Sequence, residues 1–331
     1  MTTTTEPMLD RAGEVLPLAE LARLWPLGGW FEVTRVAGGK NEHLRVRTAE
    51  GVHYLRRSYR SKSKAELIEQ LTLMRLLRSR GFPAPALVPA RTGTDHVEID
   101  GRLWIAARGI QGTPFDDRRP AHLREFGRVL TRYQRVVADL PASSTEPPVL
   151  TELRARAVRP DAEGPLPARA ADVAARLTAL LPDLPRVVVH GGARRGSLVF
   201  TGDHVSGVLD FDSAHPDVRV LDLAVAVHDV GKVYTTLGEE DHKVALDLDR
   251  VAVLLAAYRE GMSCTAAEVE ALPLLLEAKR IKRALGRLSR ARAGDQLSEN
   301  DHAKIALEDS RLHWLDEHRA ALAAVCQQAL S

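Results

Sequence analysis

The pattern of hydrophobic and polar positions changes period several times in the first third of the chain. Residues 15–25 carry apolar residues at helical spacing and stop before Pro26, which predicts a short helix. The segments 31–36, 43–48 and 52–58 instead alternate, or run apolar, over lengths typical of strands, with glycine-containing breaks between them. This order predicts an antiparallel meander of three strands.

Helical spacing returns at residues 61–80, which are apolar on one face and are followed by Gly81 as a stop signal. Residues 96–107 then form two short apolar stretches around Gly101, a pattern typical of a hairpin. The part of the chain up to residue 110 is therefore expected to be rich in strands, with one long helix.

Beyond residue 110 the pattern is mainly helical. A short apolar strand at 186–190 and a hairpin at 197–211 interrupt it, and from Val220 onward we expect almost every residue to be helical. The predicted helices of this part are 121–139, 169–181, 246–260, 265–293 and 301–329. The chain of 331 residues is long enough for two domains.

The predicted fold class is therefore α+β, with a small antiparallel-sheet lobe and a large helical lobe. We expect an N-terminal leader and helix at 1–27, a sheet-rich N-lobe at 28–110, and a helical C-lobe at 111–331.

Composition narrows the classes of protein to consider. Hydrophobic residues make up 45% and charged residues 27% of the chain, as in ordinary globular proteins. The formal net charge of +2 gives no electrostatic reason to expect nucleic acid or a membrane surface as a partner. No apolar run approaches the roughly 20 residues that span a bilayer, and the first residues show no signal-peptide pattern. With only Cys264 and Cys326, a disulfide framework is not expected, so we expect a cytoplasmic protein.

The residues that carry chemistry gather between 187 and 224. There a strand ends at His190, a glycine-bearing loop and a hairpin follow, and the hairpin leads into Asp210-Phe211-Asp212. Two carboxylates just past a buried strand are a suitable place for Mg²⁺, which prefers oxygen ligands; a capped turn is the structural alternative. His190 is either a structural histidine bonded to backbone or a proton-transfer group.

Two arginines follow in the same loop. Arg194 and Arg195 are either exposed loop charges or groups that hold a phosphate or an acidic substrate through charge-assisted hydrogen bonds. Positive charge at this loop argues mildly against a polycationic acceptor.

This stretch resembles the catalytic segment of the superfamily of aminoglycoside phosphotransferases, choline kinases and homoserine kinases. Its members usually show His-Gly-Asp, four further residues, Asn, a hairpin and an Asp-centred metal motif. Here His190-Gly191-Gly192 stands at the first motif, Ser197 at the Asn position, and Asp210 at the metal-binding Asp. The resemblance extends over roughly residues 28–320. It implies a two-lobed protein-kinase-like fold, with ATP and Mg²⁺ as cofactors and Asp210 and Ser197 as metal ligands.

The resemblance also covers the N-terminal lobe. Gly38, Gly39 and Asn41 fall on the loop that covers the nucleotide phosphates in this superfamily. Arg56 falls near the basic strand residue that pairs with those phosphates. Glu69 or Gln70 falls near the helix acid that steadies it, and the alignment favours Gln70. The expected nucleotide-binding group is therefore Gly38, Gly39, Asn41, Arg56 and Gln70.

The two departures from the family motif leave three functions open. Losing a positioned base costs about 10²–10⁴-fold in rate, and Gly192 offers no base. In a working kinase, Asp212, His190 or the substrate itself would orient the attacking hydroxyl, and Arg194 or Arg195 would stabilise charge; the acceptor would be a small molecule or a peptide. Alternatively the chain is a pseudokinase that binds nucleotide and serves a partner enzyme in a biosynthetic pathway. The third, remoter possibility is an anion-binding module that no longer binds ATP.

Overall fold

The computed structural model describes residues 8–25, 27–37, 41–59, 61–141, 146–158, 165–237, 241–292 and 299–331. The chain divides into two compact units, each described by itself below. The first unit comprises Met1–Gly112 together with Ser206–Leu209, and the second comprises Thr113–Val205 together with Asp210–Ser331.

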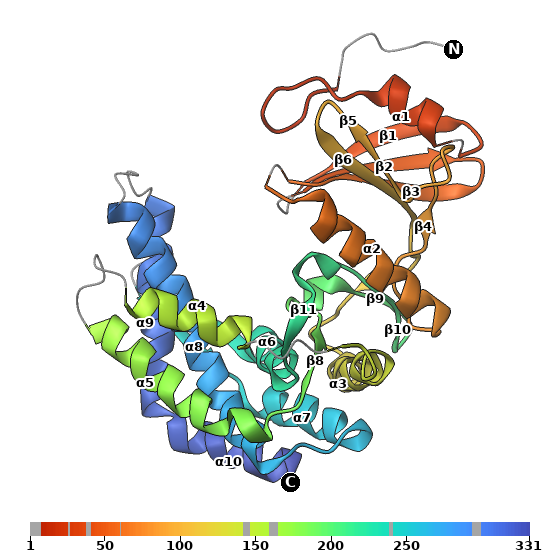
Figure 1. The fold of residues 1–331 in the computed structure, drawn as a ribbon. Helices are drawn as coiled ribbons and strands as arrows, with labels where there is room; N and C mark the ends of the chain where they lie inside the picture. Colours follow the sequence, from red (N-terminus) through yellow and green to blue (C-terminus); the bar gives the residue numbers. More distant parts are fainter. Residues whose placement is uncertain are drawn as a thin grey trace. The chain divides into compact units, whose positions relative to one another are not determined.

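The first unit is built on one antiparallel sheet with two helices (Figure 1). The strands follow the order β1-β2-β3-β6-β4, and β5 pairs with β6 outside this path. The elements are α1 (Leu18–Leu24), β1 (Trp30–Val36), β2 (Glu42–Thr48), β3 (Gly51–Arg57), α2 (Lys64–Ser79), β4 (Leu87–Val88), β5 (His96–Ile99) and β6 (Arg102–Arg108).

The two faces of this sheet have different neighbours. Alternate residues of a strand point to opposite faces, so Leu55 and Arg57 share one face of β3 and Arg56 lies on the other. Leu55 belongs to a buried cluster with Trp25 and other apolar residues of the N-terminal segment. Arg56 bonds to Gln70 of α2. The residues before β1 therefore cover one face of the sheet, while α2 covers the other.

The second unit is mainly helical (Figure 1). Its small strands pair as β9 with β7 and β10, β8 with β11, and β12 with β13. The elements are β7 (Thr113–Pro114), α3 (Pro120–Val136), α4 (Pro148–Ala157), α5 (Pro165–Leu180), β8 (Arg186–Val189), β9 (Leu198–Thr201), β10 (His204–Val208, shared with the first unit), β11 (His215–Val218), α6 (Val220–Gly231), β12 (Lys232–Leu237), β13 (Asp241–Leu246), α7 (Leu248–Gly261), α8 (Ala266–Arg292), α9 (Glu299–Glu317) and α10 (Arg319–Leu330). Single 3₁₀ turns η1 (Leu181–Asp183), η2 (Arg195–Ser197) and η3 (Phe211–Ser213) connect some of them.

The helices and strands expected from periodicity are present with small shifts at their ends, and the differences lie in the second unit. The expectation of nearly continuous helix after Val220 is wrong at residues 232–246, where β12 and β13 form an antiparallel hairpin. Its first strand carries the β-branched residues Val233, Thr235 and Thr236, which favour strands. The single helix expected at 301–329 is two helices, α9 and α10, which meet at His318. The helix α4 was not predicted.

Within the described residues, no helix combines the length and the apolar character that crossing a membrane requires. Cys264 and Cys326 are free thiols.

Candidate active site

Strand pairing brings the two halves of the candidate site together in the second unit. The strands β8 and β11 are antiparallel, and Val189 at the end of β8 pairs with His215 at the start of β11. The loop that leaves β8 at His190 therefore lies beside the turn η3, which enters β11. The contact is close: a Cβ on Gly191 would lie 2.1 Å from the Ser213 carbonyl oxygen, and Gly191 has a φ of +71°. Only glycine fits this position.

A buried carboxylate holds the start of this loop. Asp222, in the first turn of α6, is 0% exposed. Its two oxygens accept the backbone N–H groups of His190, at 2.7 Å, and Gly191, at 2.8 Å. Burial raises the pKa of Asp222, and its electrostatic interaction with His190 and these hydrogen bonds oppose the rise. Because both oxygens are used by backbone, Asp222 fixes the path of the loop.

His190 is fixed inside the unit. Its side chain is buried, and its ring lies 4.8 Å from the ring of Phe211 and 6.0 Å from that of Tyr133. Its Nδ1 accepts the backbone N–H of Gly192 at 3.3 Å. A neutral imidazole that accepts at Nδ1 carries its proton on Nε2. The contacts of His190 therefore suit a residue that shapes the loop.

Gly192 has room for a side chain, unlike Gly191. A Cβ built on Gly192 would meet Nδ1 of His190 at 3.9 Å and the side chain of Ser213 at 3.9 Å or more, which are ordinary contacts. Its φ lies outside the left-handed region. Neither space nor backbone geometry therefore requires glycine at this position.

The next two predicted residues are both occupied by contacts within the unit. The Ser197 hydroxyl accepts the Arg194 N–H at 3.0 Å and lies within hydrogen-bond distance of the carbonyls of Arg194 and Gly192. The Arg195 guanidinium bonds to Asp117 and to Asp229, and Asp229 also accepts the Arg195 backbone N–H at 2.7 Å. Ser197 thus closes the turn η2, and the charge of Arg195 is already balanced.

Asp210 differs from these residues because its carboxylate is exposed. It stands in the left-handed region, with φ 67° and ψ 55°, at the entrance to η3. A non-glycine residue there costs about 1 kcal/mol or more, although aspartate tolerates it better than most. In the described part of the chain no hydrogen bond or ion pair engages its carboxylate. Asp212 lies two residues further on, within η3, and is half-buried.

No group of three or more His, Cys, Asp or Glu side chains arranged for a metal ion occurs among the described residues. Mg²⁺ is usually held by one or two carboxylates, with water and substrate phosphates completing its shell. An exposed, unengaged carboxylate such as Asp210 fits that donor chemistry.

The structure describes three of the five predicted nucleotide-binding residues of the first unit: Asn41, Arg56 and Gln70. Arg56 and Gln70 are brought together: Nη2 of Arg56 donates to Oε1 of Gln70 at 3.2 Å. Nζ of Lys62, a residue that the sequence did not single out, donates to the same oxygen at 2.5 Å. The Oδ1 of Asn41 accepts the backbone N–H of Tyr59 at 3.1 Å. Gly38 and Gly39 lie outside the described residues.

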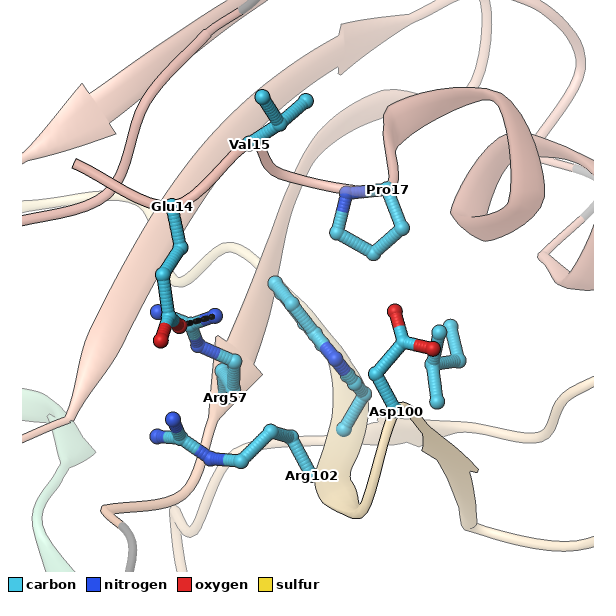
Figure 2. A pocket seen from close by; sticks show the side chains of 8 residues that line it. Glu14, Val15, Pro17, Arg57, Asp100 and Arg102 are labelled. Atoms are coloured by element: carbon cyan, nitrogen blue, oxygen red, sulfur yellow. Dashed lines mark ion pairs between the residues drawn. The ribbon is translucent and has the colours of Figure 1, made fainter. Parts of the chain in front are cut away.

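A separate cavity of about 220 Å³ lies on the other face of the same sheet (Figure 2). In Figure 2 the Glu14 carboxylate points toward Arg57, with a separation of 3.7 Å, and Arg102 lies close by. Arg57 also pairs with Asp10 of the N-terminal segment. The charge of Arg57 is therefore balanced within the first unit, and this residue is not the basic strand residue expected at a nucleotide.

Sequence reasoning missed several residues that the geometry makes important. Asp117 and Asp229, which balance Arg195, are far from it in the sequence and carry no motif. Three cations were also missed in α8: Lys279, Arg280 and Arg283. The run KRIKR at 279–283 was visible in the sequence, but a basic run in a helix is usually a solvated face, so the run alone gave no reason to select it.

The comparisons with known proteins agree on one family. The model of the phosphotransferase enzyme family matches residues 32–260. A homoserine kinase of Methylobacterium radiotolerans is 28% identical over 280 residues, covering 82% of this chain and 84% of that protein. An uncharacterized protein of Deinococcus radiodurans is 30% identical over 267 residues, covering 75% and 74%.

Solved structures show the same fold. An amicoumacin kinase, solved with AMP-PNP and Ca²⁺, superposes with a TM-score of 0.67 at 16% identity, covering 89% of this chain and 91% of that one. A microcompartment-associated aminopropanol kinase gives a TM-score of 0.65 at 15% identity, with 92% and 98% covered. The expected α+β, protein-kinase-like fold, with a sheet-containing N-terminal region and a helical C-terminal region, is confirmed.

Proposed function

The chain belongs to the phosphotransferase enzyme family, and on that basis we propose that it transfers the γ-phosphoryl group of ATP to a hydroxyl group of a small molecule or peptide. In this reaction the bond from the γ-phosphorus to the β-phosphate oxygen breaks, a bond to the acceptor oxygen forms, ADP leaves, and the hydroxyl proton passes to a base. Catalysis of this kind depends on positioning and charge stabilisation. The observation that carries the proposal is the loop after β8, which is fixed by Asp222 beside the exposed carboxylate of Asp210.

Asp210 is proposed to hold the divalent cation, for which Mg²⁺ is the expected ion. When bound, such an ion neutralises charge on the nucleotide phosphates. Arg56, steadied by Gln70, is proposed to pair with the same phosphates. Asn41, Gly38 and Gly39 complete the expected nucleotide-binding set.

Within the loop, His190 and Ser197 are proposed to be positioning residues, because their polar atoms hold loop backbone. Asp212 is the proposed group that orients the acceptor hydroxyl and takes its proton, since Gly192 has no side chain to do so. Arg194 is exposed and Arg195 is bound to two aspartates. Arg194 is therefore the loop cation that can act on a substrate.

The glycine at position 192 also supports a second candidate function. With Gly192 at the base position, a pseudokinase would bind nucleotide through Asp210 and Arg56 without transferring phosphate. It would then act through a partner enzyme. The room around Gly192 makes the two functions separable by experiment.

The test begins with calorimetric titration of ATP, with and without Mg²⁺, into the natural protein, Asp210→Ala and the exposed control Asp249→Asn. Binding that requires Mg²⁺, is lost in Asp210→Ala and is kept in Asp249→Asn supports the site. Equal binding in all three variants would place the nucleotide elsewhere.

Turnover is then measured in the natural protein and in Gly192→Asp. A working kinase turns over ATP in the presence of an acceptor and loses that activity in Asp210→Ala. A pseudokinase shows no turnover, and Gly192→Asp is then expected to introduce it, because a positioned base contributes about 10²–10⁴-fold. If neither protein turns over ATP with any acceptor, the proposed transfer is wrong.

A further inference from the structure

Positive charge collects in the second unit beside the loop after β8. The residues concerned are Arg194 in the loop and Lys279 and Arg283 in α8, here called the cation cluster. Lys279 and Arg283 are four residues apart, so they share one face of the helix. In the described part of the chain, none of the three side chains forms an ion pair.

The helix α6 explains why the loop and α8 lie near each other. Two consecutive residues of α6 face them: Asp229 binds Arg195 in the loop, and His228 lies 3.0 Å from Nη1 of Arg280 in α8. Arg194 precedes Arg195 and Lys279 precedes Arg280 in the sequence, so these contacts bring Arg194 and Lys279 into one region. Their electrostatic coupling agrees with this placement. Burial and the charges of Arg194, Arg283 and Arg280 lower the pKa of Lys279 to about 7, and the charge of Asp222 opposes them.

The surrounding helices do not balance this charge. Glu308 of α9 is 1% exposed and is shared by three arginines: Arg280, Arg287 and Arg311. Burial and the surrounding cations lower the pKa of His228, so His228 is neutral and contributes no compensation or further charge. Lys282 is paired with Glu152 of α4. Lys279 and Arg283 are thus partly buried cations that form no ion pair among the described residues, although Asp222 acts on Lys279 and Glu308 acts on Arg283 from a longer distance. A bound anion would offset the cost of burying them.

The cavity beside Arg280 is too small to hold such an anion. A cavity of about 20 Å³ lies against Arg280, His228 and Trp314. It has room for about one water molecule and is too small for a carboxylate or phosphate. An anion that pairs with the cluster would therefore lie by the loop, where Arg194 is exposed.

We propose that the cation cluster binds an anionic group of the phosphate acceptor, so that the natural acceptor is a hydroxyl compound bearing a carboxylate or a phosphate. This inference rests on the proposed function, since it assigns the substrate class of the same site. Arg194 reaches the anion from the loop, and Lys279 and Arg283 reach it from α8. Charge-assisted bonds of this kind fix orientation as well as supply affinity.

The binding test does not depend on catalysis. Inorganic phosphate is titrated into protein saturated with ADP and Mg²⁺, and heat is measured for the natural protein, Lys279→Met and Arg283→Met. The control is Arg132→Met, which removes an exposed cation from α3. We expect affinity to fall about tenfold or more in each α8 variant and to stay unchanged in Arg132→Met. Affinity that is equal in the natural protein, Lys279→Met and Arg283→Met would assign the phosphate to another site and overturn the inference.

The acceptor test compares matched pairs in an ATP-turnover assay. 4-Hydroxybutanoate is set against 4-hydroxybutanamide, and glycerol 3-phosphate against glycerol, so that the two pairs distinguish a carboxylate from a phosphate. We expect the anionic member of at least one pair to have a KM about tenfold or more lower, and Lys279→Met to remove that difference. Equal use of charged and neutral members would overturn the inference while leaving the kinase function intact. Phosphate binding at the cluster without turnover of any acceptor would support the anion site and contradict the proposed kinase function.

Discussion

Two sets of buried charge in the second unit contrast with each other. Asp222 and Glu308 are almost completely buried, and every oxygen has a partner: backbone N–H groups for Asp222, and arginines for Glu308. Lys279 and Arg283 are partly buried, and neither forms an ion pair among the described residues. Charges whose partners come from the chain hold its structure, and charges that lack such partners are candidates for a ligand. The following substitutions test this distinction.

The largest effect is expected from Glu308→Gln. This change keeps the shape of the side chain but removes the carboxylate charge that Arg280, Arg287 and Arg311 share. Breaking a buried pair typically costs 3–5 kcal/mol, so the free energy of unfolding should fall by about 3 kcal/mol or more. Urea unfolding measures it, with the exposed Glu317→Gln in the same helix as the control. A loss equal to that of the control would contradict the structural role of Glu308.

Asp222→Asn is expected to have the next largest effect. One of its two oxygens becomes an amide that cannot accept the N–H of His190 or Gly191, and a buried unpaired N–H costs about 1–3 kcal/mol. Hydrogen exchange should accelerate at the amides of His190 and Gly191 more than at β9. Unchanged protection at both amides would show that the loop does not depend on this carboxylate.

Lys279→Met is expected to stabilise the protein, whereas the two preceding substitutions are expected to destabilise it. The folded state holds the pKa of Lys279 at about 7, below its usual 10.5, so between these values the unfolded state binds more protons and stability rises with pH. The penalty for the charged form is complete below pH 7, and the variant removes it. Its gain in melting temperature should be largest at pH 6 and fade toward pH 10.5. A gain independent of pH would reflect apolar packing instead.

The smallest effect is expected at His215, which is half-exposed and is paired with Asp217. Burial opposes its charged form, but hydrogen bonds to Asp217 and to the Ser213 carbonyl outweigh it and raise the pKa above 6.5. The stabilisation is therefore complete below pH 6.5 and is lost as pH rises through the folded pKa. His215→Gln should cost less than about 1 kcal/mol at pH 5.5 and almost nothing at pH 8.5. Chemical denaturation at the two pH values measures the difference.

The sequence was sufficient for the parts of the fold and site that depend on local pattern. The meander, α2 and the strand β8 were predicted because their periodicity is local. His190, Gly192 and Asp210 were found together because one continuous stretch carries them, and antiparallel pairing of β8 with β11 brings its ends together. Gln70 was matched to Arg56, and the structure places the two side chains within hydrogen-bond distance.

The sequence was insufficient where tertiary packing decides a residue's environment. Arg194 and Arg195 are adjacent and identical in type, yet the second is bound to Asp117 and Asp229 and the first is not. Lys279 becomes distinct from other surface lysines only when α6 and α8 pack together. The β12–β13 hairpin was missed because the helical elements on both sides of it dominated the pattern.

Arg56 and Arg57 are adjacent in β3 and point to opposite faces of the sheet, where they have different partners. Arg56 bonds to Gln70 of α2, which packs on one face of the sheet. Arg57 is buried against Asp10, so this ion pair connects the segment before β1 to the sheet. Any shortened version of the protein that starts after Asp10 would remove this partner and leave Arg57, which is only 6% exposed, with its longer contact to Glu14. Expression designs that trim this end should therefore keep Asp10, or replace Arg57 at the same time.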